Sequence, residues 1–381
     1  MKNKRTKRLE LYIHIPFCVR KCLYCDFLSF PCMAGEKTDY LEALHQEILC
    51  CGRGREDGLV TSVFVGGGTP SLLTGDEMER LFGTLRQQFV FAEDAEITME
   101  ANPGTLTEEN LGGYRRAGIN RLSIGCQSVH DEELEKLGRI HRFADFCESF
   151  SLARKAGFTN INVDLMAALP GQDLSSWEDC LNRILDFAPE HISAYSLIIE
   201  EGTPYYEQED ILQLPDEDTE RRMYERTREI LRKNGYEQYE ISNYARPGYA
   251  CRHNIGYWDQ TPYLGLGLGA SSYMDEIRFK NTSDMKDYLC QAKAGVFRRE
   301  EEEILTLKNR MEECMFLGLR MTKGVGFAEF QEKFGVSMMS VYGKTIEHFV
   351  REKLLTIREN RVCLTEKGMD LANTVMAEFL L

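Results

Sequence analysis

Short apolar segments alternate with amphipathic helical segments through the first two-thirds of this 381-residue chain. An apolar run bounded by turn residues indicates a buried strand, and apolar residues spaced three or four apart indicate a helix. Repeated strand–helix units imply a parallel sheet with right-handed crossovers, which defines an α/β fold. Strands are expected at 9–15, 60–65, 96–99, 120–125, 160–165, 191–197 and 236–241, and helices at 35–50, 76–88, 142–156, 174–187 and 217–234.

The pattern changes after about residue 300, where helical segments are expected at 309–319, 327–334 and 338–353. The stretch LLTIRENRVCLT that follows them predicts a hairpin turning at Glu359 and Asn360. A final helix is expected at 366–379. Three helices with a two-stranded wing suggest a winged-helix-like module over 301–381. The acidic run 300–303 is expected to be a solvated helix start or a linker.

The charge pattern argues against a nucleic-acid-binding role. The third helix of the winged-helix-like module mixes Lys344 and Arg351 with Glu347 and Glu352, so it lacks the basic face of a DNA-recognition helix. The whole chain carries a formal net charge of −15, which disfavours general binding to phosphate backbones. The module is therefore interpreted as a protein-contact or lid domain.

The apolar segments and the cysteine count predict a cytoplasmic protein. No apolar run approaches the length of a membrane span, and no signal-peptide stretch follows the basic segment MKNKRTKRLE. Thirteen cysteines are an odd number, in a chain too large to need disulfides for stability. In the cytoplasm these thiols are expected to be free or bound to metal.

Three cysteines, Cys18, Cys22 and Cys25, stand in the stretch LYIHIPFCVRKCLYCDF, which begins with the first expected strand. Their spacing, C-x3-C-x2-C, lets one loop present three thiolates to an iron–sulfur cluster. Proteins usually bind such a cluster through four cysteine thiolates. Phe27 stands where one more cysteine could follow, so one iron would lack a protein ligand and could bind a small molecule. Zinc normally takes four ligands, and the chain has no second C-x2-C pair. The loop is therefore interpreted as a [4Fe-4S] site.

Polar residues and glycines also follow the other expected strands. The stretch GGGTP comes after the second strand, and glycines there let the backbone approach a ligand closely. Glu100, Gln127 and Asp164 each emerge from an apolar strand, at the edge where the chemistry of parallel barrels takes place. Each alone is explained as a helix cap or a solvated loop residue. Together they predict one cavity, which Arg139 and Tyr12 could complete with a planar cation and a phenol.

These motifs together resemble the radical S-adenosylmethionine superfamily, in which the open iron chelates the amino and carboxylate groups of S-adenosylmethionine. YIHIPFCVRKCLYCDF, FVGGGTPS, TMEANPGT, LSIGCQSVHDEELEKLGRIH and INVDLMAALPGQ are similar to segments of the oxygen-independent coproporphyrinogen III oxidase (HemN) family and the related HemW family. The resemblance implies a partial (β/α)6 barrel that binds a [4Fe-4S] cluster and S-adenosylmethionine. It implies that S-adenosylmethionine is contacted by Tyr12, Gly67, Glu100, Gln127, Arg139 and Asp164, with Gly68, Thr69 and 194–197 lining the same pocket.

Two features separate these two families. The HemN pattern carries a fourth cysteine where this chain has Phe27, as HemW does. The segment HNIGYW, which begins at His253, resembles the haem-binding H-N-x-x-Y-W motif of HemW. His253 can offer a ring nitrogen to haem iron, and Tyr257 and Trp258 offer flat apolar surface for a porphyrin. The resemblance therefore favours a haem-binding protein.

Alternatives stay open at this haem site. A single histidine beside aromatic residues is more often a hydrogen-bonded structural residue, and Cys251 offers a thiolate two residues earlier. Arg246 or Arg252 could meet a haem propionate. Ser271 stands where the family commonly has a histidine, so a second ligand from that position is in question.

The resemblance implies a HemW-like haem chaperone with a radical S-adenosylmethionine barrel at 1–245, a connecting segment at 246–300 and a C-terminal domain at 301–381. Haem, an unidentified acceptor protein and an unidentified electron donor would be its partners. The alternative is an oxygen-independent coproporphyrinogen III oxidase, which converts propionate side chains to vinyl groups with loss of carbon dioxide. A third alternative is a radical enzyme that modifies haem itself. The cysteine motif serves all three, so the sequence leaves open whether the chain is an enzyme.

Overall fold

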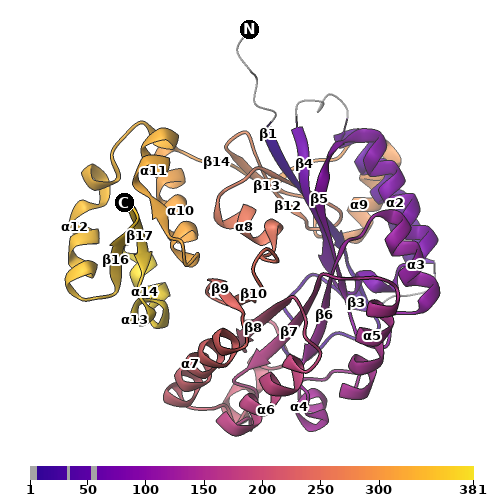
Figure 1. Ribbon diagram of the computed structural model, residues 1–381. Helices are drawn as coiled ribbons and strands as arrows, with labels where there is room; N and C mark the ends of the chain where they lie inside the picture. The colour runs from indigo at the N-terminus through magenta and orange to yellow at the C-terminus, as the bar shows by residue number, and fades with distance from the viewer. Residues whose placement is uncertain (1–6, 32–34, 53–57) are drawn as a thin grey trace.

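The computed structural model describes residues 7–31, 35–52 and 58–381 of the chain (Figure 1). All residues of the expected cluster and cofactor sites lie within these ranges. Most of the basic N-terminal segment lies outside the described residues.

Six parallel strands form the centre of the sheet, and they confirm the expected α/β fold with its partial barrel (Figure 1). They pair in chain order, and helices connect them, with α2 and α3 along one outer side of the curved sheet in Figure 1. The strands are β1 (Lys7–Ile15), β4 (Gly58–Gly67), β5 (Val90–Ala101), β6 (Arg121–Gln127), β7 (Ile161–Ala167) and β8 (His191–Ser196). The helices are α1 (Glu36–Cys51), α2 (Gly75–Gln88), α3 (Glu108–Ala117), α4 (Asp131–Lys136), α5 (Phe143–Lys155), α6 (Leu174–Leu185) and α7 (Glu217–Lys233).

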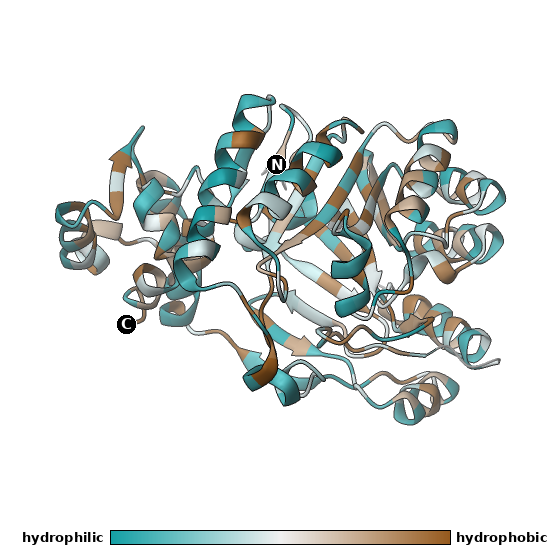
Figure 2. Ribbon diagram, turned by 90° about the horizontal axis from the view of Figure 1, so that it is seen from below, coloured by the Kyte–Doolittle hydropathy of each residue, from teal (hydrophilic) through white to brown (hydrophobic). Residues whose placement is uncertain are grey.

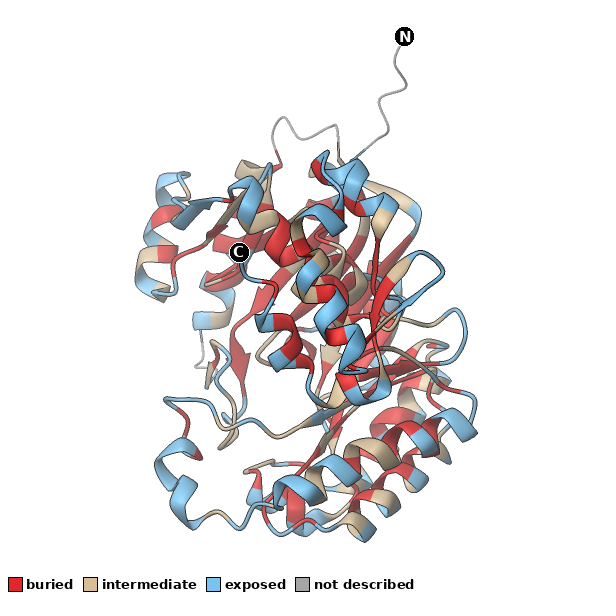
Figure 3. Ribbon diagram, turned by 90° about the vertical axis from the view of Figure 1, so that its left-hand side faces the viewer, coloured by how far each residue is buried: buried red, intermediate tan, exposed pale blue. Residues whose placement is uncertain are grey.

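The two faces of the sheet differ in polarity. On β1, Leu11 and Ile13 pack into the main hydrophobic core, together with apolar side chains of the surrounding helices. Glu10, Tyr12 and His14 alternate with them and point to the opposite face, because successive side chains of a strand point in opposite directions. Apolar (brown) segments recur along the strands in Figure 2, and most strand residues are buried in Figure 3. The inner face of the barrel is therefore the polar one.

Within the described ranges, further strands extend this sheet to twelve. Beyond β8 lie β10 (Asn243–Ala245) and β9 (Glu237–Glu240), both antiparallel to their neighbours. Beyond β1 lie the parallel β11 (Tyr263–Leu266) and the antiparallel β12 (Ser271–Met274), β13 (Ile277–Lys280) and β14 (Glu300–Ile304). The acidic run 300–303 is thus an edge strand rather than a helix start or a linker, since it pairs with β13 and places Glu303 opposite Arg278. Helices α8 (Arg252–Trp258) and α9 (Met285–Ala294) lie in the same part of the chain.

The last part of the chain forms helices and a small sheet around a second hydrophobic core. The expected hairpin is confirmed, and Glu359 and Asn360 both have positive φ, as a type I′ hairpin turn requires. The expected helix 366–379 is two short helices, because Leu371 leaves the helical conformation with φ −115° and ψ 26°. The elements are α10 (Leu307–Arg320), β15 (Val325–Gly326), α11 (Phe327–Phe334), α12 (Met338–Arg351), β16 (Leu355–Arg358), β17 (Arg361–Leu364), α13 (Glu366–Asp370) and α14 (Ala372–Ala377).

Helices α2 and α3 touch each other through two glycines. A Cβ atom added to Gly113 would lie 2.3 Å from Gly75 Cα, closer than non-bonded atoms can approach. Both glycines are buried. The absence of a side chain at each position therefore sets the distance between these two helices.

We expect Gly113→Ala to lower the free energy of unfolding by about 1–3 kcal/mol, because the new methyl group forces the two helices apart. Gly112→Ala is the matched control, since its Cβ would meet only the end of the Arg116 side chain, at 3.4 Å. Alanine in a helix is favoured over glycine by about 1 kcal/mol, so the control should be at least as stable as the parent protein. Urea unfolding followed by circular dichroism measures both variants, and an unchanged Gly113→Ala variant would contradict the close contact.

Candidate cluster and cofactor site

The loop with the three cysteines is held at both ends by a short parallel pair. β2 (Phe17–Cys18) pairs with β3 (Phe30–Pro31), and Phe30 N–H donates to Pro16 C=O at 2.9 Å. In the middle of the loop, Leu23 N–H donates to Leu137 C=O at 3.1 Å, and Leu23 C=O accepts from the backbone N–H of Tyr205 at 3.1 Å. The loop is therefore fixed by backbone hydrogen bonds to segments far along the chain.

The three sulfur atoms lie among hydrogen-bond donors. Thr69 Oγ1 donates to Cys18 Sγ at 3.5 Å, and Arg139 Nη1 donates to Cys22 Sγ at 3.7 Å. All three cysteines are free of disulfides. Burial raises the pKa of the Cys25 thiol, and a backbone hydrogen bond at Phe27 partly opposes this. Donors aimed at sulfur stabilise thiolates, the form that binds iron.

The arrangement fits a cluster better than a single metal ion. Among the described residues, no three His, Cys, Asp or Glu side chains converge closely enough to share one ion. A cluster has separate irons and takes one thiolate at each, so its ligands need not converge on one point. Three free thiols on one anchored loop meet that requirement.

The glycine-rich turn after β4 lies directly against the cysteine loop. Gly68 N–H donates to Ile15 C=O at 2.8 Å, and a Cβ atom on Gly68 would lie 2.6 Å from Phe17 O. Gly67 has φ +113°, a backbone conformation that residues with a side chain rarely adopt. Its N–H donates to Glu100 Oε2 at 3.0 Å. The turn thus joins the cysteine loop to the predicted carboxylate of β5.

Glu100 and Asp164 face the inner side of the barrel. Burial, together with the nearby Asp164 carboxyl, raises the pKa of Glu100 to about 8. Burial also raises the pKa of Asp164, although hydrogen bonds from Ser123 Oγ at 2.9 Å and Asn162 Nδ2 at 2.7 Å oppose it. Both carboxyls would bind an ammonium group or hydroxyl donors in place of the water they have lost.

Asn102 is a site residue that the sequence analysis missed. Its Nδ2 donates to Thr69 Oγ1 at 2.8 Å, and its Oδ1 accepts from Arg139 Nη2 at 2.7 Å. Arg139 Nη2 also donates to Gly125 C=O at 2.9 Å, close to Gln127, which has φ +66°. Asn102 thereby connects two of the predicted residues, and its position two residues after Glu100 was the available signal.

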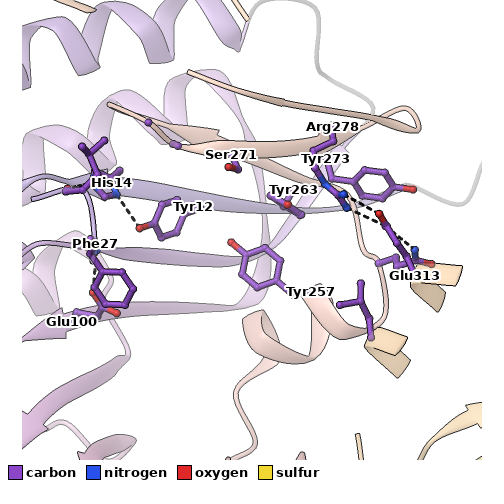
Figure 4. A pocket seen from close by; sticks show the side chains of 16 residues that line it. Tyr12, His14, Phe27, Glu100, Tyr257, Tyr263, Ser271, Tyr273, Arg278 and Glu313 are labelled. Atoms are coloured by element: carbon purple, nitrogen blue, oxygen red, sulfur yellow. Dashed lines mark hydrogen bonds and ion pairs between the residues drawn. The ribbon is translucent and has the colours of Figure 1, made fainter. Parts of the chain in front are cut away.

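A cavity of about 560 Å³ opens on the inner side of the barrel (Figure 4). Of the predicted residues, Tyr12, Gly67 and Glu100 line it, together with His14, whose Nδ1 is 3.0 Å from the Tyr12 hydroxyl. Figure 4 shows Glu100 and His14 at one end and Tyr273, Arg278 and Glu313 at the other. Tyr257 and Tyr263 lie between the two ends, and Ser271 and Phe27 also belong to the lining.

The segment 194–197 does not line this cavity. Ala194, Tyr195 and Ser196 line a second cavity of about 560 Å³, with Trp177 and residues of α7 and α14. Leu197 packs instead against a small apolar cluster that includes Leu137 and Leu169. β8 therefore contributes to a different hollow from the one that Gly67 and Glu100 line.

His253 points into the interior and has partners on both ring nitrogens. Its Nδ1 is 2.8 Å from Ser62 Oγ, its Nε2 is 3.2 Å from the Tyr257 hydroxyl, and 1% of its surface is exposed. Burial lowers the pKa of His253 to about 3. Cys251 is also fully buried, and its Sγ donates to Glu96 Oε1 at 3.5 Å. In this conformation neither predicted haem ligand is exposed to a ligand, and the assignment to His253 stays a prediction.

The two arginines considered for a propionate have partners as well. Arg252 Nη1 forms an ion pair with Asp94 Oδ2 at 2.9 Å, and the Arg246 guanidinium lies over the Tyr236 ring. Arg320 lies over the Trp258 ring at 4.5 Å, so this side of the motif faces the C-terminal module rather than the cavity. Of the aromatic pair, only Tyr257 reaches the cavity.

The Radical SAM superfamily model matches residues 12–184, and the HemN C-terminal domain model matches residues 305–371. The chain is thus a radical S-adenosylmethionine protein with a HemN-type C-terminal domain, a class whose members bind a [4Fe-4S] cluster and S-adenosylmethionine. "Heme chaperone HemW" of Lactococcus lactis is 39% identical over 373 residues, which cover 97% of each chain. The protein of the same name from Bacillus subtilis is 39% identical over 375 residues, covering 97% of this chain and 98% of the relative. This chain belongs to the HemW family.

A solved structure shares the fold along almost the whole chain. Coproporphyrinogen III oxidase (HemN) from Escherichia coli superposes with a TM-score of 0.86 at 24% identity, covering 99% of this chain and 91% of that one. Both the barrel and the C-terminal module are thus common to the two proteins. Of the helices in the described residues, none combines the length and apolar character that crossing a bilayer requires.

We expect the variant Cys18→Ala/Cys22→Ala/Cys25→Ala to bind no cluster after anaerobic reconstitution, because every expected protein ligand is gone. Iron and sulfide analysis and the broad visible absorption of the cluster measure this. A control with alanine at Cys147 and Cys290, which lie on α5 and α9, should keep the full cluster. A full cluster in the triple variant would place the site elsewhere.

The raised pKa of Glu100 predicts a pH-dependent stability of the ligand-free protein. Between the ordinary value of 4.5 and about 8, the folded state keeps the Glu100 proton while the unfolded state loses it. The free energy of unfolding should therefore fall as the pH rises through this interval. Glu100→Gln should make the dependence shallower, whereas Glu109→Gln on the exposed side of α3 should not. Denaturant unfolding at several pH values tests this, and equal slopes in both variants would contradict it.

Proposed function

We propose that this protein is a haem chaperone, which binds haem, a [4Fe-4S] cluster and S-adenosylmethionine and delivers haem to acceptor proteins. The observation that carries the proposal is the 39% identity to "Heme chaperone HemW" of Lactococcus lactis over 97% of both chains. The match runs through the barrel, the HNIGYW segment and the C-terminal module. It therefore concerns the whole arrangement and not the cysteine loop alone.

Cys18, Cys22 and Cys25 would hold three irons of the cluster, and the fourth would stay open for S-adenosylmethionine. When bound, the cluster supplies an electron to S-adenosylmethionine. Gly67 offers backbone groups for the methionine moiety, and Glu100 can release its proton to bind an ammonium group. Arg139 supports Cys22 through its hydrogen bond to sulfur. Tyr12, Gly68, Thr69, Gln127 and Asp164 complete the set of proposed S-adenosylmethionine-site residues.

The cavity supports haem as the cargo. Tyr257, Tyr263 and Tyr273 give it a wall of phenol rings, which suits the flat apolar face of a porphyrin. Arg278 at the far end is a planar cation that can pair with a carboxylate. A volume of about 560 Å³ lies within the usual range for small-molecule and cofactor pockets.

The proposed partners are a haem-acceptor protein and an electron donor, neither of them identified by the sequence. The winged-helix-like module is the proposed protein-contact or lid domain. Its helix α12 mixes acidic with basic residues, so we do not assign a nucleic-acid partner. The cytoplasmic location remains a prediction.

We expect ferric haemin to bind the anaerobically reconstituted protein with a shift of the haem Soret band. On the same preparation, coproporphyrinogen III with S-adenosylmethionine and a reductant should yield no protoporphyrinogen, because Phe27 replaces the fourth cysteine of the HemN pattern. Absorbance titration measures the first, and chromatography of the porphyrin products measures the second. The Cys18→Ala/Cys22→Ala/Cys25→Ala variant is the control for any product that forms without the cluster.

The two measurements separate the two functions. Cluster-dependent formation of protoporphyrinogen would make the protein a coproporphyrinogen III oxidase. Haemin binding without product supports the chaperone, and the absence of haemin binding would overturn it.

A further inference from the structure

A third cavity, of about 330 Å³, lies where the C-terminal module meets the end of helix α8. Trp258, the last residue of α8, lines it from one side, and residues of α10, α11, β15 and β17 line it from the module. Arg8 of β1 completes the wall. This hollow, the module cavity, is distinct from the one that Tyr12 and Glu100 line, although Gln260 borders both. Ligand sites occur preferentially at such junctions between domains.

Positive charge predominates in the module cavity. Of the described residues that line it, four are cationic and two carry carboxyl groups, namely Arg8, Lys323, Lys333 and Arg361 against Asp259 and Glu329. The two larger cavities have the opposite balance, with two carboxyl groups against one arginine in the first and three against two arginines in the second. A surplus of two positive charges is thus a local feature in a chain of net charge −15. A cleft lined by one sign of charge concentrates ligands of the opposite sign.

Two of the cations keep hydrogens available for a ligand. Lys333 Nζ donates to Gln260 Oε1 at 2.6 Å and makes no other hydrogen bond within the described residues. The Lys323 ammonium pairs with Asp259 alone in the same part of the chain, with Nζ 3.2 Å from Asp259 Oδ1. An ammonium group has three N–H donors. Each lysine can therefore bind its present partner and a ligand oxygen together.

Trp258 contributes a donor that has no acceptor. Its Nε1–H is buried and lacks a hydrogen-bond partner among the residues that the structure describes. One face of the indole ring is covered by the Arg320 guanidinium, which lies 4.5 Å from the ring centre. The N–H of a buried tryptophan usually has a partner. An acceptor oxygen bound in the module cavity would provide one.

Arg361 supplies positive charge rather than unused hydrogens. Its Nε donates to Lys323 C=O and its Nη2 to Gly324 C=O, both at 2.9 Å. The same guanidinium donates to both carboxylate oxygens of Glu329, with Nη2 3.0 Å from Oε2. Arg361 is thus fixed in place, and the Glu329 charge offsets its attraction for a ligand anion.

We propose that the module cavity binds a small phosphate-bearing molecule. This inference goes beyond the haem-chaperone function and does not depend on it. A phosphate monoester carries a charge of about −1.5 to −2 at neutral pH and three strong acceptor oxygens. That charge matches the surplus of two positive charges, and the three oxygens match the unused donors of Lys323, Lys333 and Trp258. A single carboxylate has one charge and two oxygens, so it would leave part of this set without a partner.

The volume and position of the cavity indicate the size of the ligand and its effect. About 330 Å³ lies near the lower limit of the usual range for small-molecule pockets, which begins at about 300 Å³. A compact phosphate ester is therefore favoured over a large cofactor. Its oxygens would connect Trp258 of α8 with Lys323 and Lys333 of the module, so binding should stabilise the contact between the two parts of the chain.

The test is calorimetric titration of the full-length protein with inorganic phosphate and with glycerol 3-phosphate, at neutral pH and constant ionic strength. Both probes should bind at one site per chain. Lys323→Gln and Lys333→Gln should each weaken binding about tenfold or more, because each removes a hydrogen bond between charged groups. Trp258→Phe keeps an aromatic ring but removes the N–H, and it should weaken binding about fivefold. Lys344→Gln, an exposed position on α12, makes the same change of charge outside the cavity and should leave binding unchanged.

Glu329→Gln provides a gain of affinity, since it removes the carboxylate that competes for Arg361, and binding should become several-fold tighter. Circular dichroism reports whether each variant is folded. Absence of binding by both probes would overturn the proposal, as would equal losses of affinity in Lys344→Gln and Lys333→Gln, which would show a response to net charge alone. Succinate binding as tightly as phosphate would overturn the ligand class. Haemin titration of the same preparation tests the chaperone function separately, so either conclusion can fail while the other holds.

Discussion

The parallel pairing of β1 with β4 is the constraint on which the rest of the structure depends. Parallel neighbours end at the same edge of a sheet, so the loops that follow them must meet there. The register places Ile15 opposite Gly67, which brings the cysteine loop and the glycine-rich turn into backbone contact. A shift by one residue would turn Tyr12 and His14 into the apolar core and leave the cysteine loop without its support. The buried face of β1 therefore specifies the cofactor site as well as the fold.

Several strands present polar side chains on the inner face of the barrel, and burying these side chains lowers the stability of the folded protein. Cross-strand neighbours such as Glu10 and Ser62, or Glu100 and Ser123, line the buried interior of the barrel. Desolvation raises the pKa of both glutamates to about 8, so each carboxyl is favoured in its neutral form when no ligand is present. Such an interior loses stability relative to an apolar one but retains groups that a charged ligand can satisfy. The outer, apolar face of the same strands supplies the packing that offsets the loss.

The sequence was sufficient to predict the elements that have a strong hydrophobic periodicity. It did not predict strand directions and edge strands, because these are determined by the neighbouring strands in the sheet. The six parallel strands and the hairpin at Glu359 were predicted because alternating or continuous apolar runs and turn residues mark them locally. The placement of the antiparallel β10 between β8 and β9, and the pairing of the edge strand β14, depend on neighbours that no local pattern contains. For the site, the cysteines and Glu100 follow from spacing and strand ends, whereas Asn102, two residues after Glu100, is identified as a site residue through its contacts with Thr69 and Arg139. The orientation of His253 was equally hidden, because a helix of seven residues has no long periodic face to indicate which side is buried.

Glu10, Tyr12 and His14 lie on the same face of β1, and this face of the strand runs between the two ends of the cavity. His14 and Tyr12 belong to the end that Gly67 and Glu100 line, whereas Glu10 lies beneath α8, where a Cβ atom on Gly256 would come within 1.9 Å of its carboxylate. A side chain at position 256 would displace the Glu10 carboxylate, so glycine there lets helix α8 approach β1 closely, and this approach sets where Tyr257 enters the cavity. Residues two apart on a single rigid strand thus define both the cofactor end and the position of the phenol. Because the strand is held on both sides by β4 and β11, the separation between these two ends is determined by the sheet rather than by the loops.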